Sequence, residues 1–202
     1  MPRTAERGGP QTRARILEAA HWMFLERGYD AVTVAEVARQ AGVSSVTVFN
    51  HFPRKEDLFL DRSDEAIELV RSAIRDRGAG VGALAALRAL AFRLYEERHP
   101  FSGLDERSLP FFRTVAASPA LVARAREILA ELQRALTDDL ERDAAFDGDA
   151  TLLAAFFLAG YSTVLIATGR TVIAGEARDV VLDAHRARLE RLFDALESGL
   201  RG

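Results

Sequence analysis

Four short polar side chains stand at helical spacing in the segment SSVTVFNH, residues 44–51: Ser45, Thr47, Asn50 and His51. Hydroxyl, amide and imidazole groups of this size can hydrogen-bond to the edges of DNA bases when a helix enters the major groove. Arg54 and Lys55 follow directly, where their cationic groups can reach phosphates. This pattern predicts recognition of double-stranded DNA.

Two short helices joined by a sharp turn must present these side chains. Thr33 is a good N-cap, and Glu36 three residues later completes a capping box. Gly42 is expected to end the first helix, because glycine adopts the left-handed conformation at little cost. Ser44 can then cap the second helix. The spacing predicts a helix-turn-helix motif.

The second helix and a preceding one are expected to supply the core. Val48 and Phe52, four residues apart, face inward if the polar residues face outward. An amphipathic helix over about 12–27 carries one apolar stripe: Ile16, Ala20 and Phe24. An ordinary helical hairpin would share the caps and the turn. The flanking cations and the third helix favour a DNA-binding head.

Residues 12–60 resemble the DNA-binding head of TetR-type transcription regulators. The matching motifs are RGYDAVTV, AGVSSVTVFNHF and KEDL. The resemblance implies an all-α fold with a three-helix head at 12–56 and a helical ligand-binding and dimerisation domain at 57–202. It further implies a homodimer that represses from a near-palindromic operator and leaves it when a small ligand binds. Residues 1–11 contain arginine, glycine and proline and no apolar run, so we expect a flexible arm there, and together with the predicted DNA binding we expect a cytoplasmic protein. The expected DNA contacts come from Thr33, Ser44, Ser45, Val46, Thr47, Phe49, Asn50, His51, Arg54 and Lys55.

Two residues depart from the family pattern. Phe49 stands where members often carry a tyrosine whose hydroxyl touches a phosphate, so its ring is expected to pack against a sugar or the protein core. Val46 stands where a small residue is common, so it can contact the methyl group of thymine.

Composition limits the remaining classes of function. The chain has 202 residues and no cysteine, which excludes disulfides and thiolate chemistry. Net charge is −3, but residues 1–55 carry eight basic and five acidic side chains, so the cations gather near the predicted head. The arm can also reach phosphates through three arginines: Arg3, Arg7 and Arg13.

Helical spacing continues through the rest of the chain. We expect helices over 56–77, 83–98, 104–117, 118–142, 150–168 and 177–199. Residues 150–168 carry no charge, which by length alone permits a membrane span, although several polar residues favour the centre of a bundle. We therefore expect a homodimer through about 150–174 and 177–199, and no membrane. Ala159 and Gly160 would allow close approach at that seam.

Aromatic residues in the middle helices predict an apolar ligand cavity. Its candidate lining is Phe92, Tyr95, His99, Phe111, Phe112, Arg113, Phe156, Phe157, Tyr161 and Thr163. Each of these residues can also be ordinary core. The expected ligand is small and hydrophobic, such as an acyl thioester or a fatty acid, with planar aromatic drugs as the alternative.

Two other classes of function are weighed against a regulator. The four histidines are scattered without a metal-binding spacing, and no nucleophile elbow or phosphate loop is present, so no catalytic residue, metal or cofactor is expected. An adaptor that kept the fold but lost DNA binding is the second alternative, and the polar outer face with its adjacent cations argues against it.

Overall fold

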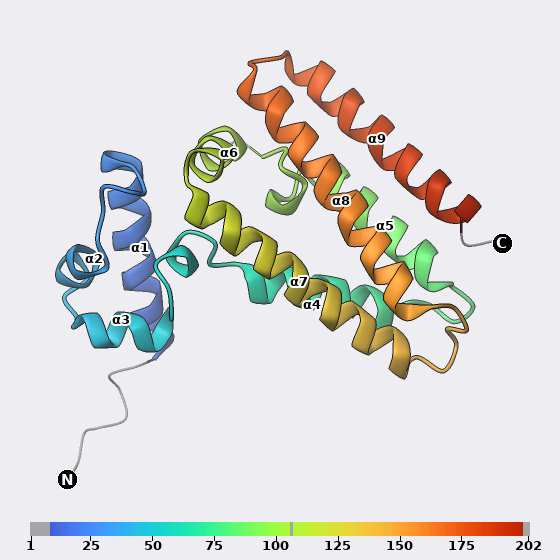
Figure 1. Ribbon diagram of the computed structural model, residues 1–202, viewed down its shortest axis with the longest axis horizontal. Coiled ribbons are helices and arrows are strands. Elements are labelled where there is room, and N and C mark those ends of the chain that lie inside the picture. The colour runs from blue at the N-terminus through green and yellow to red at the C-terminus, as the bar shows by residue number, and fades with distance from the viewer. Residues whose placement is uncertain (1–8, 106, 200–202) are drawn as a thin grey trace, which may run out of the picture. The chain divides into compact units, whose positions relative to one another are not determined.

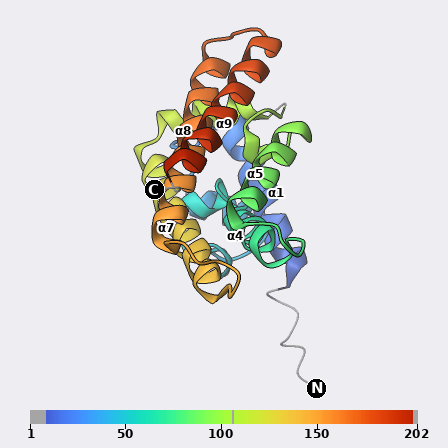
Figure 2. The same ribbon diagram turned by 90° about the vertical axis from the view of Figure 1, so that its right-hand side faces the viewer.

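The computed structural model describes residues 9–105 and 107–199, and this part of the chain is helical without strands (Figure 1, Figure 2). The elements are α1 Pro10–Arg27, α2 Val34–Gln40, α3 Ser45–His51, η1 Glu56–Leu58, α4 Ser63–Arg75, α5 Ala83–Glu96, η2 Pro100–Ser102, α6 Ser108–Ala117, α7 Pro119–Arg142, α8 Ala150–Ile173 and α9 Arg178–Gly199. The all-α fold class predicted from the sequence is confirmed.

The chain divides into two compact units. The first, which we call the head, contains the described residues up to Arg62 together with Thr114–Ala125. The second, the body, contains Ser63–Arg113 and the described residues from Arg126 onward. Helices α6 and α7 therefore each contribute residues to both units. The domain boundaries predicted at residues 11 and 56 stay predictions.

One apolar cluster holds the head together. Its buried residues are Ile16, Ala19, Ala20, Met23, Phe24, Tyr29, Val32, Val37, Ala38, Ala41, Val48, Phe52, Leu58 and Leu121. The stripe predicted on α1 faces this cluster, and small Ala38 lets α2 approach its neighbours closely. Leu121, which comes from the distant segment 114–125, is fully buried among them.

The helix expected over 56–77 is instead two elements, η1 and α4, separated at residues 59–62. Contacts within the head hold this stretch in place. Leu58 is fully buried in the head cluster, and the carbonyl oxygen of Asp61 accepts a hydrogen bond from Arg13 at 3.1 Å. The acidic start signal at Glu56 therefore yields a single turn. Likewise α6 begins at Ser108 rather than at residue 104, after a buried Leu104.

In the body, α8 and α9 lie side by side along most of their length (Figure 1, Figure 2). Asp149 caps α8 by accepting a hydrogen bond from the Leu152 amide at 2.8 Å. A methyl group on Gly160 would collide with Leu192 of α9. Gly160 therefore allows close packing of α8 against α9 within one chain. Its expected place at a seam between two chains stays a prediction.

Helix α8 is long and apolar enough to cross a membrane by length and composition, with a mean hydropathy of 1.9. Its buried residues face the body core, and they include Leu153, Ala154, Phe157 and Leu158. Only 33% of the most apolar 18-residue stretch of α8 is buried, so a large apolar surface of this helix is left on the opposite side. Such a surface needs a cover, which we consider below.

A buried histidine joins α8 to α9. The hydroxyl of Thr168 donates to the carbonyl of Val164 at 2.9 Å and therefore accepts from Nδ1 of His185 at 2.8 Å. The His185 ring also stacks on Tyr95 of α5, with centroids 5.7 Å apart. Burial, together with the nearby Arg188, lowers the pKa of His185 from 6.5 to about 4. The folded protein thus holds this imidazole neutral.

This histidine should make the stability of the protein depend on pH. Between pH 6.5 and pH 4 the unfolded chain takes up a proton at residue 185 that the folded chain rejects, so the free energy of unfolding falls as the pH falls. The loss should reach about 3 kcal/mol at pH 4. Urea unfolding across this pH range measures the free energy of unfolding of the unaltered protein and of His185→Gln. The unaltered protein should lose more of this free energy as the pH falls. His21→Gln, at an exposed histidine, is the control. Parallel losses in the protein and in His185→Gln would contradict this account.

Candidate nucleic-acid interface and ligand cavity

The start of α2 is fixed by a complete capping box. The backbone amide of Glu36 donates to the Thr33 hydroxyl at 3.3 Å, while the Glu36 carboxylate accepts from the Thr33 amide at 2.8 Å. Arg27 adds an ion pair to Glu36 at 2.7 Å. Hydrogen bonds from Thr33 and Arg27 lower the pKa of Glu36 to about 2. The carboxylate therefore remains charged and holds α2 against the end of α1.

The turn and the cap that orient α3 match the sequence prediction. Gly42 has a φ of +67°, which a side chain would strain. Ser44 accepts a hydrogen bond from the Thr47 amide at 3.1 Å and begins α3. Val48 and Phe52 are 0% and 2% exposed and anchor the helix in the head cluster. One face of α3 is thereby fixed inward, and the opposite face is presented to solvent.

The outward face of α3 combines polar and apolar groups. Val46 is 68% exposed and Phe49 is 48% exposed. The ring of Phe49 therefore lies outside the protein core. Of the two placements expected for this ring, only the contact with a DNA sugar remains as a prediction. Thr47 shares a 2.9 Å hydrogen bond with Ser44, so its hydroxyl is partly used within the cap. Asn50 is exposed, and no partner for its amide is found within the described part of the chain.

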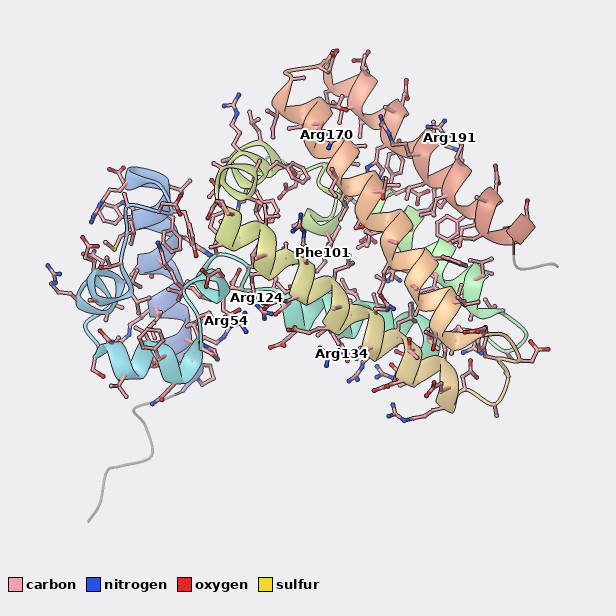
Figure 3. The ribbon with its side chains drawn as sticks, viewed as in Figure 1. Arg54, Phe101, Arg124, Arg134, Arg170 and Arg191 are labelled. Atoms are coloured by element: carbon pink, nitrogen blue, oxygen red, sulfur yellow. The ribbon has the colours of Figure 1, made fainter. Side chains whose placement is uncertain are left out.

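The cations beside α3 are less free than the sequence suggested. The Lys55 ammonium donates to the backbone carbonyl of Tyr29 at 2.6 Å and lies 4.1 Å from the centre of its ring. Burial lowers the pKa of Lys55. Arg13 lies 4.9 Å over the ring of Phe52 in addition to its bond to Asp61. Exposed Arg54 is labelled in Figure 3.

Two of the predicted arm arginines, Arg3 and Arg7, lie outside the described residues. The phosphate contacts assigned to the cations stay predictions. Lys55 has a structural role in the head in any case, because it ties η1 to the segment after α1.

The segment 114–125 packs into the head through contacts that the sequence did not reveal. Arg124 and Asp57 form an ion pair at 2.8 Å, with side chains only 13% and 17% exposed (Arg124 is labelled in Figure 3). The Ser118 hydroxyl lies 3.2 Å from a carboxylate oxygen of Asp30. The sequence marked Ser118 only as a helix start, because a partner 88 residues away leaves no local signal.

The body contains an apolar cavity of about 220 Å³. It is lined by Ala66, Leu69, Val70, Leu90, Ala91, Leu94, Pro100, Phe101, Gly103, Phe111, Phe112, Leu129, Leu132, Phe157, Leu158, Tyr161, Ser162 and Leu165. The two side-chain hydroxyls in this lining are engaged, since Tyr161 donates to the Phe101 carbonyl at 3.2 Å and Ser162 to the Ala159 carbonyl at 2.9 Å.

Four of the ten predicted ligand residues line this cavity, and six lie elsewhere. The four are Phe111, Phe112, Phe157 and Tyr161. Phe92 packs near Phe193, Tyr95 stacks on His185, and His99 caps η2. Phe156, Thr163 and Arg113 are exposed. The aliphatic lining from α4, α5 and α7 was missed, because leucines at helical spacing are indistinguishable from ordinary core in a sequence.

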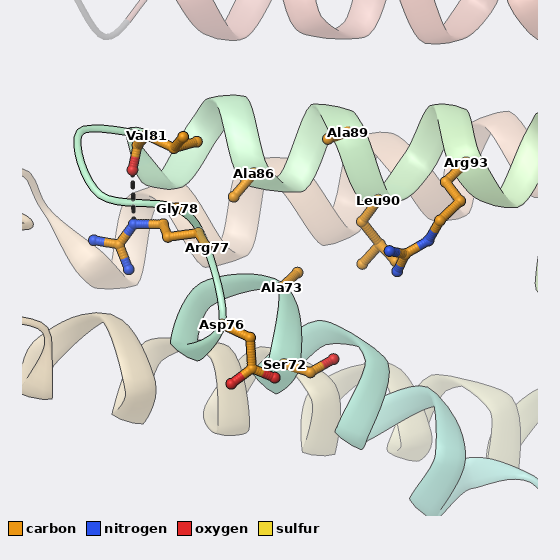
Figure 4. Close-up of a pocket in the computed structure, with 10 residues that line it drawn as sticks. All are labelled: Ser72, Ala73, Asp76, Arg77, Gly78, Val81, Ala86, Ala89, Leu90 and Arg93. Carbon is orange, nitrogen blue, oxygen red and sulfur yellow. Dashed lines mark hydrogen bonds between the residues drawn. The ribbon is translucent and has the colours of Figure 1, made fainter.

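A second, more polar hollow of about 310 Å³ lies between α4, the loop after it and α5 (Figure 4). Arg77 fixes this loop by donating to the carbonyl of Val81 at 2.8 Å, as drawn, and to that of Ile74 at 2.7 Å. It also forms an ion pair with Asp143 of the segment after α7. This arginine therefore serves the fold rather than a ligand.

Known proteins share this sequence pattern and fold. The family model for bacterial regulatory proteins of the tetR family matches residues 16–61. The regulator TcmR of Streptomyces glaucescens is 29% identical over 194 residues, which cover 94% of this chain and 81% of TcmR. The solved structure of Thermus thermophilus FadR, a TetR-family repressor in complex with lauroyl-CoA, is 25% identical with a TM-score of 0.54 and covers 89% of this chain and 92% of FadR.

The match to other relatives is shorter. The repressor AcnR of Corynebacterium jeikeium is 30% identical over 87 residues, which are 43% of this chain and 46% of AcnR. The chain thus spans about half the length of several curated relatives that it matches. The residues matched by the family model, 16–61, include α2 and α3.

Proposed function

Because this chain belongs to the TetR family of bacterial regulatory proteins, we propose that it is a ligand-responsive transcriptional repressor. In this proposal it binds a near-palindromic operator as a cytoplasmic homodimer and leaves the operator when a small hydrophobic ligand enters the body. The observation that carries the proposal is the outward face of α3, held by two caps and two buried anchors.

The residues of this face match the groups that read DNA. Asn50 has a free amide that can pair with adenine, and exposed Val46 can contact the methyl group of thymine. Thr33, Ser44, Ser45, Thr47, Phe49, His51, Arg54 and Lys55 complete the proposed contact set. An adaptor without DNA binding would not need the polar side chains of this face together with the cations that follow it. No catalytic role is proposed, and the named relatives are regulators.

The exposed face of α8 supports the homodimer. Its residues repeat at intervals of four and three, as in a helix that packs against a partner helix: Leu152, Phe156, Ala159, Thr163, Ile166, Arg170 and Ile173, all exposed. A second copy would cover this stripe with its own, through about 150–174 and 177–199. That cover also explains the apolar length of α8 without a membrane.

The cavity supports control by a ligand. It lies in the body and is lined in part by Phe111 and Phe112 of α6. Within the same helix, Val115 packs against the head cluster. A ligand that binds better to one arrangement of α6 than to another would shift the population of the two. The neighbour FadR was solved in complex with lauroyl-CoA, which supports a small hydrophobic ligand for the body.

The DNA reading role is tested by two substitutions with different expected effects. Asn50→Ala should cost about 1–3 kcal/mol at the operator and relax the base preference, because a paired amide is removed. Lys55→Met should weaken binding to all sequences alike and lower the salt slope by about one. It should also lower the stability of the head, since the contact with Tyr29 is lost. Gel shifts on DNA flanking the gene, with urea unfolding alongside, measure these effects. A changed base preference in Lys55→Met but not in Asn50→Ala would reverse the assigned roles.

The dimer is tested on the exposed stripe of α8. The protein should scatter light as twice the 22.2 kDa of one chain at micromolar concentration. Ile166→Glu, at a position 56% exposed, should shift the mass toward a single chain with helicity intact, because two charges would be buried together at the seam. Thr151→Glu, exposed on the same helix outside the stripe, is the matched control. An unchanged mass in Ile166→Glu would place the interface elsewhere.

A further inference from the structure

We propose that the body cavity takes a compact, uncharged ligand, about the size of a single aromatic ring with small substituents, that donates a hydrogen bond to Tyr161. This inference rests on the proposed function, because it names the class of ligand for the same regulator. It narrows the ligand away from fatty acids and acyl thioesters. Three properties of the cavity carry it: its size, the lack of charged residues in its described lining, and the oriented hydroxyl of Tyr161.

Size sets the first limit. The cavity measures about 220 Å³. A cavity of about 150 Å³ lined by aliphatic and aromatic side chains holds benzene, so this volume suits one substituted ring. It is too small to enclose a long acyl chain together with its head group.

The ring of Phe112 keeps one wall of the cavity in place. A methyl group on Gly103 would lie 2.6 Å from this ring, and one on Gly169 would lie 2.8 Å from it. The ring therefore occupies a slot that exists only because both neighbours are glycines. The slot holds Phe112 between the end of η2 and α8, so the cavity does not widen on that side without repacking.

Charge sets the second limit. Among the described residues that line the cavity, none is charged. Arg113, the cation expected there, is exposed and is absent from the lining. An ionised carboxylate that moves from water into such surroundings loses the free energy of its hydration, and no charged partner compensates for that loss. Neutral molecules are therefore selected over their acidic counterparts of the same shape.

The third property is the oriented hydroxyl of Tyr161, one of two hydroxyls in the lining; the other, of Ser162, donates to the Ala159 carbonyl of its own helix. Tyr161 donates its proton to the Phe101 carbonyl at 3.2 Å, so its oxygen keeps lone pairs that can accept a hydrogen bond. Its ring stacks near Phe157, with centroids 5.9 Å apart, and both rings line the cavity. Burial raises the pKa of Tyr161, so the hydroxyl remains protonated and keeps this arrangement. A phenol in the cavity can donate to that oxygen while its ring lies against aromatic and aliphatic walls.

Three probes of similar size separate these properties: toluene, phenol and benzoate. At pH 7 the first two are neutral and the third is ionised. Calorimetric titration of the full-length protein should show saturable binding of toluene and phenol, with benzoate at least about tenfold weaker than either. Tyr161→Phe should weaken phenol about tenfold, the effect of one hydrogen bond, and leave toluene unchanged. Tyr95→Phe, at a tyrosine outside the cavity, should change neither.

A second variant keeps the proposal testable if Tyr161→Phe fails to fold. Ala66→Phe adds volume at a partly exposed lining position and should abolish binding of toluene and phenol together. Unchanged binding of both in Ala66→Phe would place the probes elsewhere. Benzoate binding as tightly as toluene, or equal losses of phenol and toluene in Tyr161→Phe, would overturn the proposal.

Operator binding by the ligand-free protein separates the two levels of the account. If the protein binds its operator but none of the neutral probes, the ligand class is wrong and the proposed repressor stands. If the neutral probes bind with the expected selectivity but no operator is bound, the proposed function is wrong and the ligand class stands.

Discussion

The structure depends on how the chain passes between its two units, because α6 and α7 each belong partly to the head and partly to the body. Phe112 lines the body cavity, and Val115, one helical turn later, packs against the head cluster. Leu121 then lies fully buried in that cluster, and Arg124 pairs with Asp57 nearby. Because Phe112 and Val115 lie about one turn apart on the same helix, we expect a displacement of Phe112 to move Val115 as well.

A ligand acts on such a structure only through a difference in affinity between two states. A compact apolar cavity supplies that difference through packing, since a filled cavity and an empty one favour different positions of its walls. The required coupling is small, about 1–3 kcal/mol. In the proposed dimer, two heads would present α3 at half-sites about 34–36 Å apart, and a modest change in how the two heads are held would prevent that.

Local signals in the sequence predicted the structure of α2, the turn and α3 well, because they describe contacts within a few residues. The two helix caps, at Thr33 with Glu36 and at Ser44, join residues three apart in the sequence. The positive φ of Gly42 is a property of one residue. The features that were missed are non-local. The contact of Lys55 with Tyr29 spans 26 residues, and the contact of Gly160 with Leu192 joins two helices, so neither contact leaves a local signal in the sequence. The cavity was seen only through its aromatics, since its aliphatic walls look like core.

The central claim is that ligand and operator compete through the same two states, and reciprocal coupling tests it most directly. Operator affinity is measured with and without phenol, and phenol affinity with and without operator, at fixed salt. The account predicts that each ligand weakens the other by the same factor, within about 5–150-fold, because linkage makes the two effects equal. Phenol that binds in the cavity and leaves operator affinity unchanged would contradict it.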